Sequence, residues 1–153
     1  MMYEKFGQFI DGKWCQSSDK STYEVINPAN EETLGHASKA TSEDVDRALK
    51  SAEKGLEVWK KTPPWQRSYI IRRIADKIRE KQDVLAKWMT LEVGKPFVEA
   101  KGEVNGAADI FEWNAEETKR IYGQTVESRF EDTRVHVYYQ PVGVVAALSP
   151  WNF

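Results

Sequence analysis

The clearest hydrophobic pattern is an unbroken apolar run near the end of the chain, from Val142 to Leu148. The run is short, rich in valine and alanine, and bracketed by Pro141 and Pro150. This pattern predicts a β-strand buried on both faces, as in a parallel sheet, and disfavours a helix. A parallel strand needs parallel neighbours joined by long crossovers, and no second run of this type occurs upstream. We therefore expect the front piece of a longer protein, or a chain that borrows its sheet from elsewhere.

Two consecutive segments carry the period of amphipathic helices. Thr41, with an acidic residue three positions later, is a capping-box pattern that predicts the start of a helix. Pro63 and Pro64 break this helix and begin a second one, because proline is tolerated in a first turn. The apolar stripes of the two helices are Val45, Ala48, Leu49, Ala52, Leu56 and Trp59 in the first, and Tyr69, Ile70, Ile74 and Ile78 in the second.

Two further helices are predicted beyond this pair. Asp83 is a candidate cap for a helix over residues 84–93, which Gly94 ends. A long helix then runs from about residue 97 to 122, with Gly123 as a candidate stop. The small residues of this helix predict close approach to another element; they are Gly102, Gly106, Ala107 and Ala108.

Strand patterns occur on both sides of the helical region. Asp11-Gly12 between apolar residues predicts a tight hairpin over residues 9–14, and residues 23–26 form a short extended segment. Residues 124–126 and 134–140 form a second pair of strands, an arm with two distinct faces. Its second strand alternates Val135, Val137 and Tyr139 with Arg134, His136 and Tyr138. An isolated ribbon is marginal in water, so we expect the arm to need a partner surface on another subunit.

Composition and charge fit one soluble domain. The 153 residues carry a net charge of -2 with acids and bases interspersed, which argues against a nucleic-acid or membrane partner. No signal-peptide pattern begins the chain, so we expect a cytoplasmic protein. The basic side of the second helix fits either phosphate contacts or, as we favour, a solvated face paired with acids such as Asp76 and Glu80; its residues are Arg67, Arg72, Arg73, Lys77 and Arg79.

Few residues carry obvious chemistry. One cysteine and two separated histidines, His36 and His136, do not make a metal site, and no glycine-rich phosphate loop is present. Cys15 has no histidine close in sequence, which favours a structural thiol over a nucleophile. Glu116 and Glu117 are adjacent on a predicted helix and face apart, so they do not form a two-carboxylate site.

Asn152 is the remaining candidate, and it follows the predicted buried strand through Ser149, Pro150 and Trp151. In open α/β sheets, ligands bind just beyond the carboxyl ends of the strands. A rigidly held amide N–H there stabilises a developing oxyanion. The alternative is a turn asparagine bonded to its own backbone, which local chemistry alone favours.

Motifs along the whole chain resemble the aldehyde dehydrogenase superfamily. In order they are FIDGKW (residues 9–14), VINPA (25–29), LEVGKP (91–96), QPVG (140–143) and PWNF (150–153). The run EAKGEV (99–104), followed by EW (112–113) and KRIYG (119–123), is most similar to the succinate-semialdehyde dehydrogenase branch.

The resemblance covers the N-terminal third of the family and implies an α/β fold. It implies the front of a Rossmann-like cofactor domain, rich in helices, with a β-hairpin arm and the first parallel strand. Residues 1–123 would be the N-terminal helical part of the cofactor-binding domain and residues 124–141 the oligomerisation arm. Residues 142–153 would be the first strand and the start of the cofactor and oxyanion loop. Ser149, Pro150, Trp151 and Asn152 would line an NAD or NADP site, and Asn152 would be the catalytic oxyanion donor.

The resemblance also implies a reaction that this chain does not complete alone. The family oxidises aldehydes to carboxylates through a cysteine thiohemiacetal, and its nucleophilic cysteine and its glutamate base lie further along the family's sequences. Cys15 does not match the motif of that nucleophile. We therefore expect an inactive fragment of a homo-oligomeric oxidoreductase for a small aldehyde such as succinate semialdehyde. The alternative is a non-catalytic, self-associating interaction module, and a cysteine motif encoded downstream would discriminate between the two.

Overall fold

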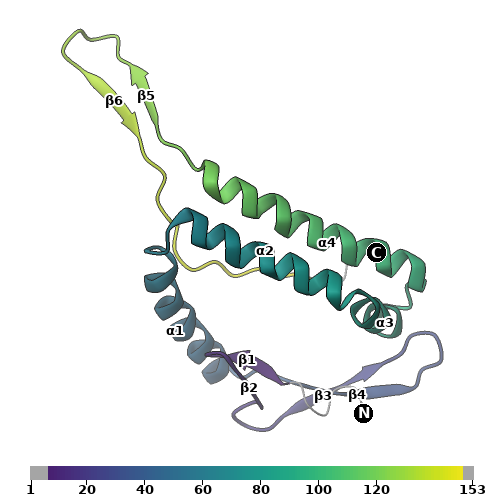
Figure 1. The fold of residues 1–153 in the computed structure, drawn as a ribbon. Helices are drawn as coiled ribbons and strands as arrows, with labels where there is room; N and C mark the ends of the chain where they lie inside the picture. Colours follow the sequence, from purple (N-terminus) through teal and green to yellow (C-terminus); the bar gives the residue numbers. More distant parts are fainter. Residues whose placement is uncertain (1–6, 150–153) are drawn as a thin grey trace.

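The computed structural model describes residues 7–149. Two hairpins lead into four helices, and a third hairpin projects from the helical layer as an arm (Figure 1). Each sheet within these residues is a two-stranded antiparallel pair of consecutive strands. The elements are β1 (Gln8–Ile10), β2 (Lys13–Cys15), β3 (Thr22–Ile26), β4 (Thr33–Ser38), α1 (Ser42–Trp59), α2 (Pro64–Glu80), α3 (Gln82–Val93), α4 (Phe97–Glu117), η1 (Thr118–Arg120), β5 (Gln124–Glu127) and β6 (Arg134–Val137).

The first hairpin confirms the predicted turn. Asp11 and Gly12 have φ angles of 53° and 74°, the left-handed conformation that a type I′ turn requires at both central residues. Strand β3 confirms the predicted extended segment, but the sequence pattern does not predict its partner β4. The small and polar residues of β4 carry little period-two signal, so only the pairing itself reveals the strand.

Helix α1 begins with the predicted capping box. The hydroxyl of Thr41 accepts a hydrogen bond from the backbone N–H of Asp44 at 3.2 Å. In return, Asp44 Oδ2 accepts from the backbone N–H of Thr41 at 3.0 Å. This exchange satisfies two backbone donors at the helix start and fixes where α1 begins.

Asp44 also ties the first hairpin and the following loop to α1. Its carboxylate is 1% exposed and accepts hydrogen bonds from Gln8 Nε2 at 3.2 Å, Ser17 Oγ at 3.1 Å and the backbone N–H of Ser18 at 3.2 Å. Arg47 pairs with it at 2.5 Å. The hydrogen bond from the Thr41 backbone is the largest cause that holds the pKa of Asp44 far below its ordinary value, against the opposing effect of burial.

The ends of the other helices confirm the proline and glycine signals in part. Helix α2 begins at Pro64, and α3 ends at Gly94 with a φ of 77°, the left-handed C-cap expected of glycine. Asp83 is not the cap of α3, because that helix begins one residue earlier; Asp83 instead pairs with Lys101 of α4 at 2.7 Å.

The end of α4 differs from the prediction. The helix ends at Glu117 and tightens into the 3₁₀ turn η1, where Thr118 Oγ1 donates to the carbonyl oxygen of Asn114 at 2.8 Å. The candidate stop, Gly123, lies outside the helix at the base of the arm. A Cβ on Gly123 would stand 2.6 Å from the carbonyl oxygen of Val137, so this glycine permits the two strands of the arm to converge.

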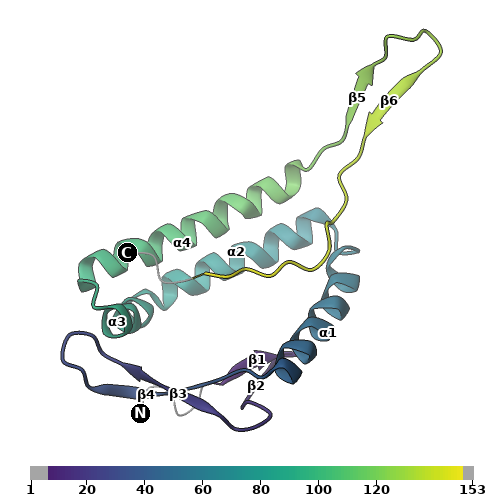
Figure 2. The same ribbon diagram turned by 180° about the vertical axis from the view of Figure 1, so that it is seen from behind.

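The core lies where α2, α3 and α4 pack together (Figure 2). It consists of Ala86, Met89, Ala100 and Val104, against which Ile78 and Leu85 pack. The predicted close approach is wrong at Gly102 and Gly106, because a Cβ on either would meet nothing within 4 Å. It is confirmed at Ala108, which is fully buried, and Ala100 and Ala115 of α4 are fully buried as well.

Ion pairs between α2 and α4 reinforce this packing. Arg72 pairs with Glu112 at 2.6 Å and also with Glu116, and Arg79 pairs with Asp109 at 2.8 Å and with Glu112 at 2.6 Å. The prediction of a basic face paired with acids is therefore confirmed, but most of the acids come from α4. The predicted partner Glu80 pairs with Lys77.

The predicted apolar stripe of α1 is only partly covered. Val45 and Leu49 are 49% and 46% exposed, and Trp59 is also exposed. The stripe has helical spacing, but no element within residues 7–149 packs over most of it. Burial of this face therefore requires polypeptide beyond the described residues, or a partner.

We expect Asp44→Asn to lower the thermal stability of the chain by several degrees, because it weakens a buried acceptor of hydrogen bonds and its pair with Arg47. The depressed pKa means that the folded chain binds fewer protons than the unfolded chain. The stabilisation is therefore complete above the ordinary aspartate pKa of 3.8 and is lost as the pH falls below it.

The measurement is thermal unfolding followed by circular dichroism between pH 3 and pH 7, with Asp46→Asn on the same helix as the control. The difference between wild type and Asp44→Asn should shrink at the acid end. A difference that stays constant across this range would contradict the role of the ionised carboxylate.

Candidate functional site

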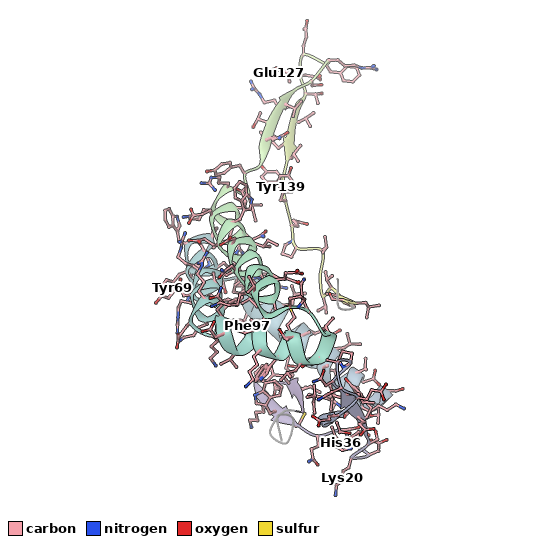
Figure 3. All side chains as sticks on the ribbon, turned by 90° about the vertical axis from the view of Figure 1, so that its right-hand side faces the viewer. Lys20, His36, Tyr69, Phe97, Glu127 and Tyr139 are labelled. Atoms are coloured by element: carbon pink, nitrogen blue, oxygen red, sulfur yellow. The ribbon has the colours of Figure 1, made fainter. Side chains whose placement is uncertain are left out.

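The segment that leads to the predicted site is extended but unpaired. After β6 the chain turns back from the arm and continues as a thread beside the helical layer (Figures 2 and 3). Val142, Val145 and Leu148 are 92%, 72% and 94% exposed, and no strand within residues 7–149 pairs with this segment. The predicted buried strand is therefore not formed in this structure. The physical reason is that a strand needs neighbours on its edges, and each described strand pairs only with its neighbour in sequence, so none is hydrogen-bonded to residues 142–148.

The predicted site residues lie at the end of this thread. Ser149 is exposed, and it is the last residue that the structure describes. Pro150, Trp151 and Asn152 lie outside the described residues. The roles expected of these residues therefore stay predictions from the sequence.

The arm that precedes the thread confirms the predicted pair of strands. Strands β5 and β6 pair from Gln124↔Val137 to Glu127↔Arg134. All residues of the two strands are exposed, and the arm stands away from the helices (Figure 3). Both edges of this ribbon lack a neighbouring strand within residues 7–149, and such edges favour pairing with another chain.

A pocket of about 390 Å³ lies where the thread leaves the arm. Its lining comes from segments far apart in sequence: Leu56, Trp59, Lys60, Arg67, Ile71, Thr118, Ile121, Tyr139, Gln140 and Pro141. Here the chain changes direction from the arm to the thread. Sequence reasoning does not find this pocket, because no local motif brings α1, α2 and residues 139–141 together.

The two histidines of the described residues lie far apart. His36 lies at the end of the molecule opposite Tyr139 at the base of the arm, so it is remote from His136 of β6 (Figure 3). His136 Nδ1 instead lies 3.2 Å from the hydroxyl of Thr125 across the arm. Within residues 7–149, no group of three or more histidine, cysteine, aspartate or glutamate residues is arranged to hold a metal ion.

The acidic residues of α4 are engaged in ion pairs. Glu116 contacts Lys119 and Arg72, and Glu117 contacts Arg120. Lys119 first and Arg72 second lower the pKa of Glu116, which keeps it ionised. This agrees with the prediction that Glu116 and Glu117 do not act as a two-carboxylate site.

Cys15 ends β2, is half-buried, and its Sγ donates to the carbonyl oxygen of Gln8 at 3.5 Å. Within residues 7–149 this thiol makes no hydrogen bond to a histidine, which is consistent with a thiol that is not an activated nucleophile. None of the helices within residues 7–149 is long and apolar enough to cross a membrane.

The accessible surface is large for the size of the chain. It measures 12053 Å², whereas a compact monomer of this mass exposes about 7,900 Å². The excess of roughly 4,000 Å² exceeds the surface that one partner contributes to a typical obligate interface, which is half of the total area buried. The unpaired thread, the arm and the apolar face of α1 account for part of this surface.

Relatives of known activity share this sequence over nearly its whole length. The chain is 43% identical over 145 residues to glutarate-semialdehyde dehydrogenase of Pseudomonas aeruginosa, and 42% identical over 144 residues to the NADP(+) succinate-semialdehyde dehydrogenase of Escherichia coli. These alignments cover 95% and 94% of this chain, but 30% of each relative. The chain therefore spans less than a third of the length of the curated relatives that it matches.

Solved structures agree with the fold. The crystal structure of succinate-semialdehyde dehydrogenase from Burkholderia pseudomallei superimposes with a TM-score of 0.84 and 36% identity, over 88% of this chain and 28% of that one. The likeness shows that the helices and hairpins are the α/β N-terminal portion of such enzymes, as the sequence predicted.

A sequence profile of the aldehyde dehydrogenase family matches residues 14–153, which is most of the chain. The match runs through the described helices, the arm and the thread into the predicted site residues. The chain belongs to the aldehyde dehydrogenase family.

Proposed function

We propose that this chain supplies the N-terminal part of an NAD(P)-dependent aldehyde dehydrogenase. The observation that carries the proposal is the collinear match over residues 14–153, with 42% to 43% identity to semialdehyde dehydrogenases across the chain. The parent enzyme would oxidise an aldehyde to a carboxylate: a cysteine thiolate adds to the aldehyde, a hydride passes to the nicotinamide, and water hydrolyses the resulting thioester.

The substrate class follows from the relatives. Glutarate semialdehyde and succinate semialdehyde are short aldehydes with a carboxylate at the far end, and both names occur among the relatives. We infer a substrate of the same class for the parent enzyme. The cofactor would be NAD or NADP, and the Escherichia coli relative is named for NADP(+).

In the parent enzyme, residues 142–153 would contribute the first strand and the start of the cofactor and oxyanion loop. Ser149, Pro150 and Trp151 would line the cofactor site, and the side-chain amide of Asn152 would donate to the thiohemiacetal oxyanion. The high exposure of Val142, Val145 and Leu148 supports this role, because an extended apolar segment without a paired strand can still join a sheet. The nucleophile and the base would come from the remainder of the parent, so this chain alone should not oxidise aldehydes.

The arm would serve subunit association. Its residues are exposed along both strands, and its edges have no neighbouring strand within residues 7–149. A purely associative, non-catalytic module is the second candidate, and the same exposed arm favours it. The two candidates differ in whether residues 149–152 are needed for oxidation.

A chimaera tests the catalytic proposal. Residues 1–153 are joined to the part of the Escherichia coli relative that follows its matched region, and NADP-linked oxidation of succinate semialdehyde is measured. We expect activity from the chimaera and none from residues 1–153 alone. Asn152→Ala should reduce kcat by about 10²–10³-fold, because it removes one oxyanion donor.

Asn30→Ala provides the matched control, since it removes an amide side chain from an exposed turn far from residue 152 in the sequence. It should leave kcat unchanged. A folded chimaera in which Asn152→Ala retains full activity would remove the oxyanion role, and activity of residues 1–153 alone would contradict the division of labour.

The arm gives a separate prediction about association. Light scattering of this chain should show species heavier than the 17.6 kDa monomer. Val135→Lys with Val137→Lys places two charges on one face of β6 and should shift the mass towards the monomer. His136→Lys with Tyr138→Lys places the same charges on the other face and should have the smaller effect. A clean monomer for the unmodified chain at high concentration would rule out association through the arm.

A further inference from the structure

A basic pocket lies between the first hairpin and α1, away from the residues proposed for oxidation. Four cationic side chains line it: Lys13 from β2, and Arg47, Lys50 and Lys54 from α1. Its volume is about 390 Å³, within the range of pockets that hold small ligands. The remaining lining residues are Ile10, Asp11, Cys15 and Ser51.

The charges that line this pocket are unbalanced. Asp11 is the one carboxylate among the described lining residues, and it accepts a hydrogen bond from Ser51 Oγ at 3.4 Å. Arg47 is paired with Asp44, but Lys13, Lys50 and Lys54 form no ion pair within residues 7–149. The chain as a whole is acidic, with a net charge of -2, so this pocket is a local concentration of positive charge. An anion in the pocket would relieve the repulsion among these cations.

We propose that this pocket binds a compact, multiply charged anion of the phosphate class. Lysine ammonium groups bind phosphate as point charges, and they come here from the first hairpin and from α1, which the hydrogen bond from Gln8 of β1 to Asp44 joins. Ile10 and Cys15 give the pocket an apolar side, which leaves room for the uncharged part of a phosphorylated small molecule. The site is independent of the proposed oxidation, because none of its residues belongs to the thread or the arm.

Cys15 makes this proposal directly testable. It lines the pocket, is half-buried, and is the single cysteine among the 153 residues. A ligand in the pocket therefore shields a thiol that a labelling reagent reports without interference from another site. Iodoacetamide is a suitable reagent because it is uncharged, so its reaction reports access to the thiol rather than attraction to the lysines.

The experiment measures alkylation of Cys15 by iodoacetamide in the full chain as pyrophosphate is added at constant ionic strength. We expect the rate to fall in a saturable way, and we expect isothermal titration calorimetry to give the same affinity. Sodium chloride at equal ionic strength should give no saturable effect. Lys50→Gln with Lys54→Gln should weaken pyrophosphate binding by about tenfold, because two of the lining charges are removed.

Lys39→Gln with Lys61→Gln is the matched control, since it removes the same charge from exposed lysines that do not line the pocket. It should leave the affinity for pyrophosphate unchanged. The proposal is overturned if neither shielding nor binding heat saturates, if chloride reproduces the effect, or if both double variants weaken binding equally.

Discussion

An extended segment needs hydrogen-bond partners for its backbone N–H and C=O groups. If its side chains are apolar, their burial away from water is also favourable. Residues 142–148 meet neither requirement within the described chain: they are extended, uncharged and largely exposed. The same constraint explains the excess surface, because a helical layer is normally covered on the face that its apolar residues occupy. Helix α1 leaves Val45 and Leu49 half-exposed, and α2 and α3 leave a groove of about 460 Å³ whose apolar residues include Ile70, Ile74 and Leu85. These apolar surfaces lack a covering element within residues 7–149.

The helical unit is nevertheless held together by identifiable contacts. Its core is small and rich in alanine, which allows α2 and α4 to pack closely. At this distance Arg72 and Arg79 of α2 form ion pairs with acidic residues of α4. Exposed ion pairs of this kind contribute little singly, and they gain most when several charges share partners, as Glu112 does here. The network thus fixes the register of the two helices more than it stabilises them.

Local signals in the sequence predict most of the elements. The Thr41 capping box, the Asp11-Gly12 turn, the Pro64 start and the Gly94 stop each depend on a few neighbouring residues, and each is confirmed. The errors arise where distant residues decide. Asp83 takes a partner on α4 rather than capping its own helix, and residues 142–148 read as a buried strand because the pattern reports what a segment can become, not whether a neighbour is present. The proposed site at residues 149–152 depends mainly on resemblance to a family, and it stays a prediction because Pro150, Trp151 and Asn152 lie outside the described residues.

The contacts of Asp44 have a consequence for synthesis on the ribosome. The residues that form hydrogen bonds or an ion pair with this carboxylate lie between Gln8 and Arg47, so all of them precede α2 in the chain. The amino-terminal hairpin and α1 can therefore fasten to each other while the valine-rich thread is still untranslated, consistent with the vectorial order in which chains fold as they emerge. The exposed apolar segment 142–148 then emerges after the first hairpin and α1 have made these contacts.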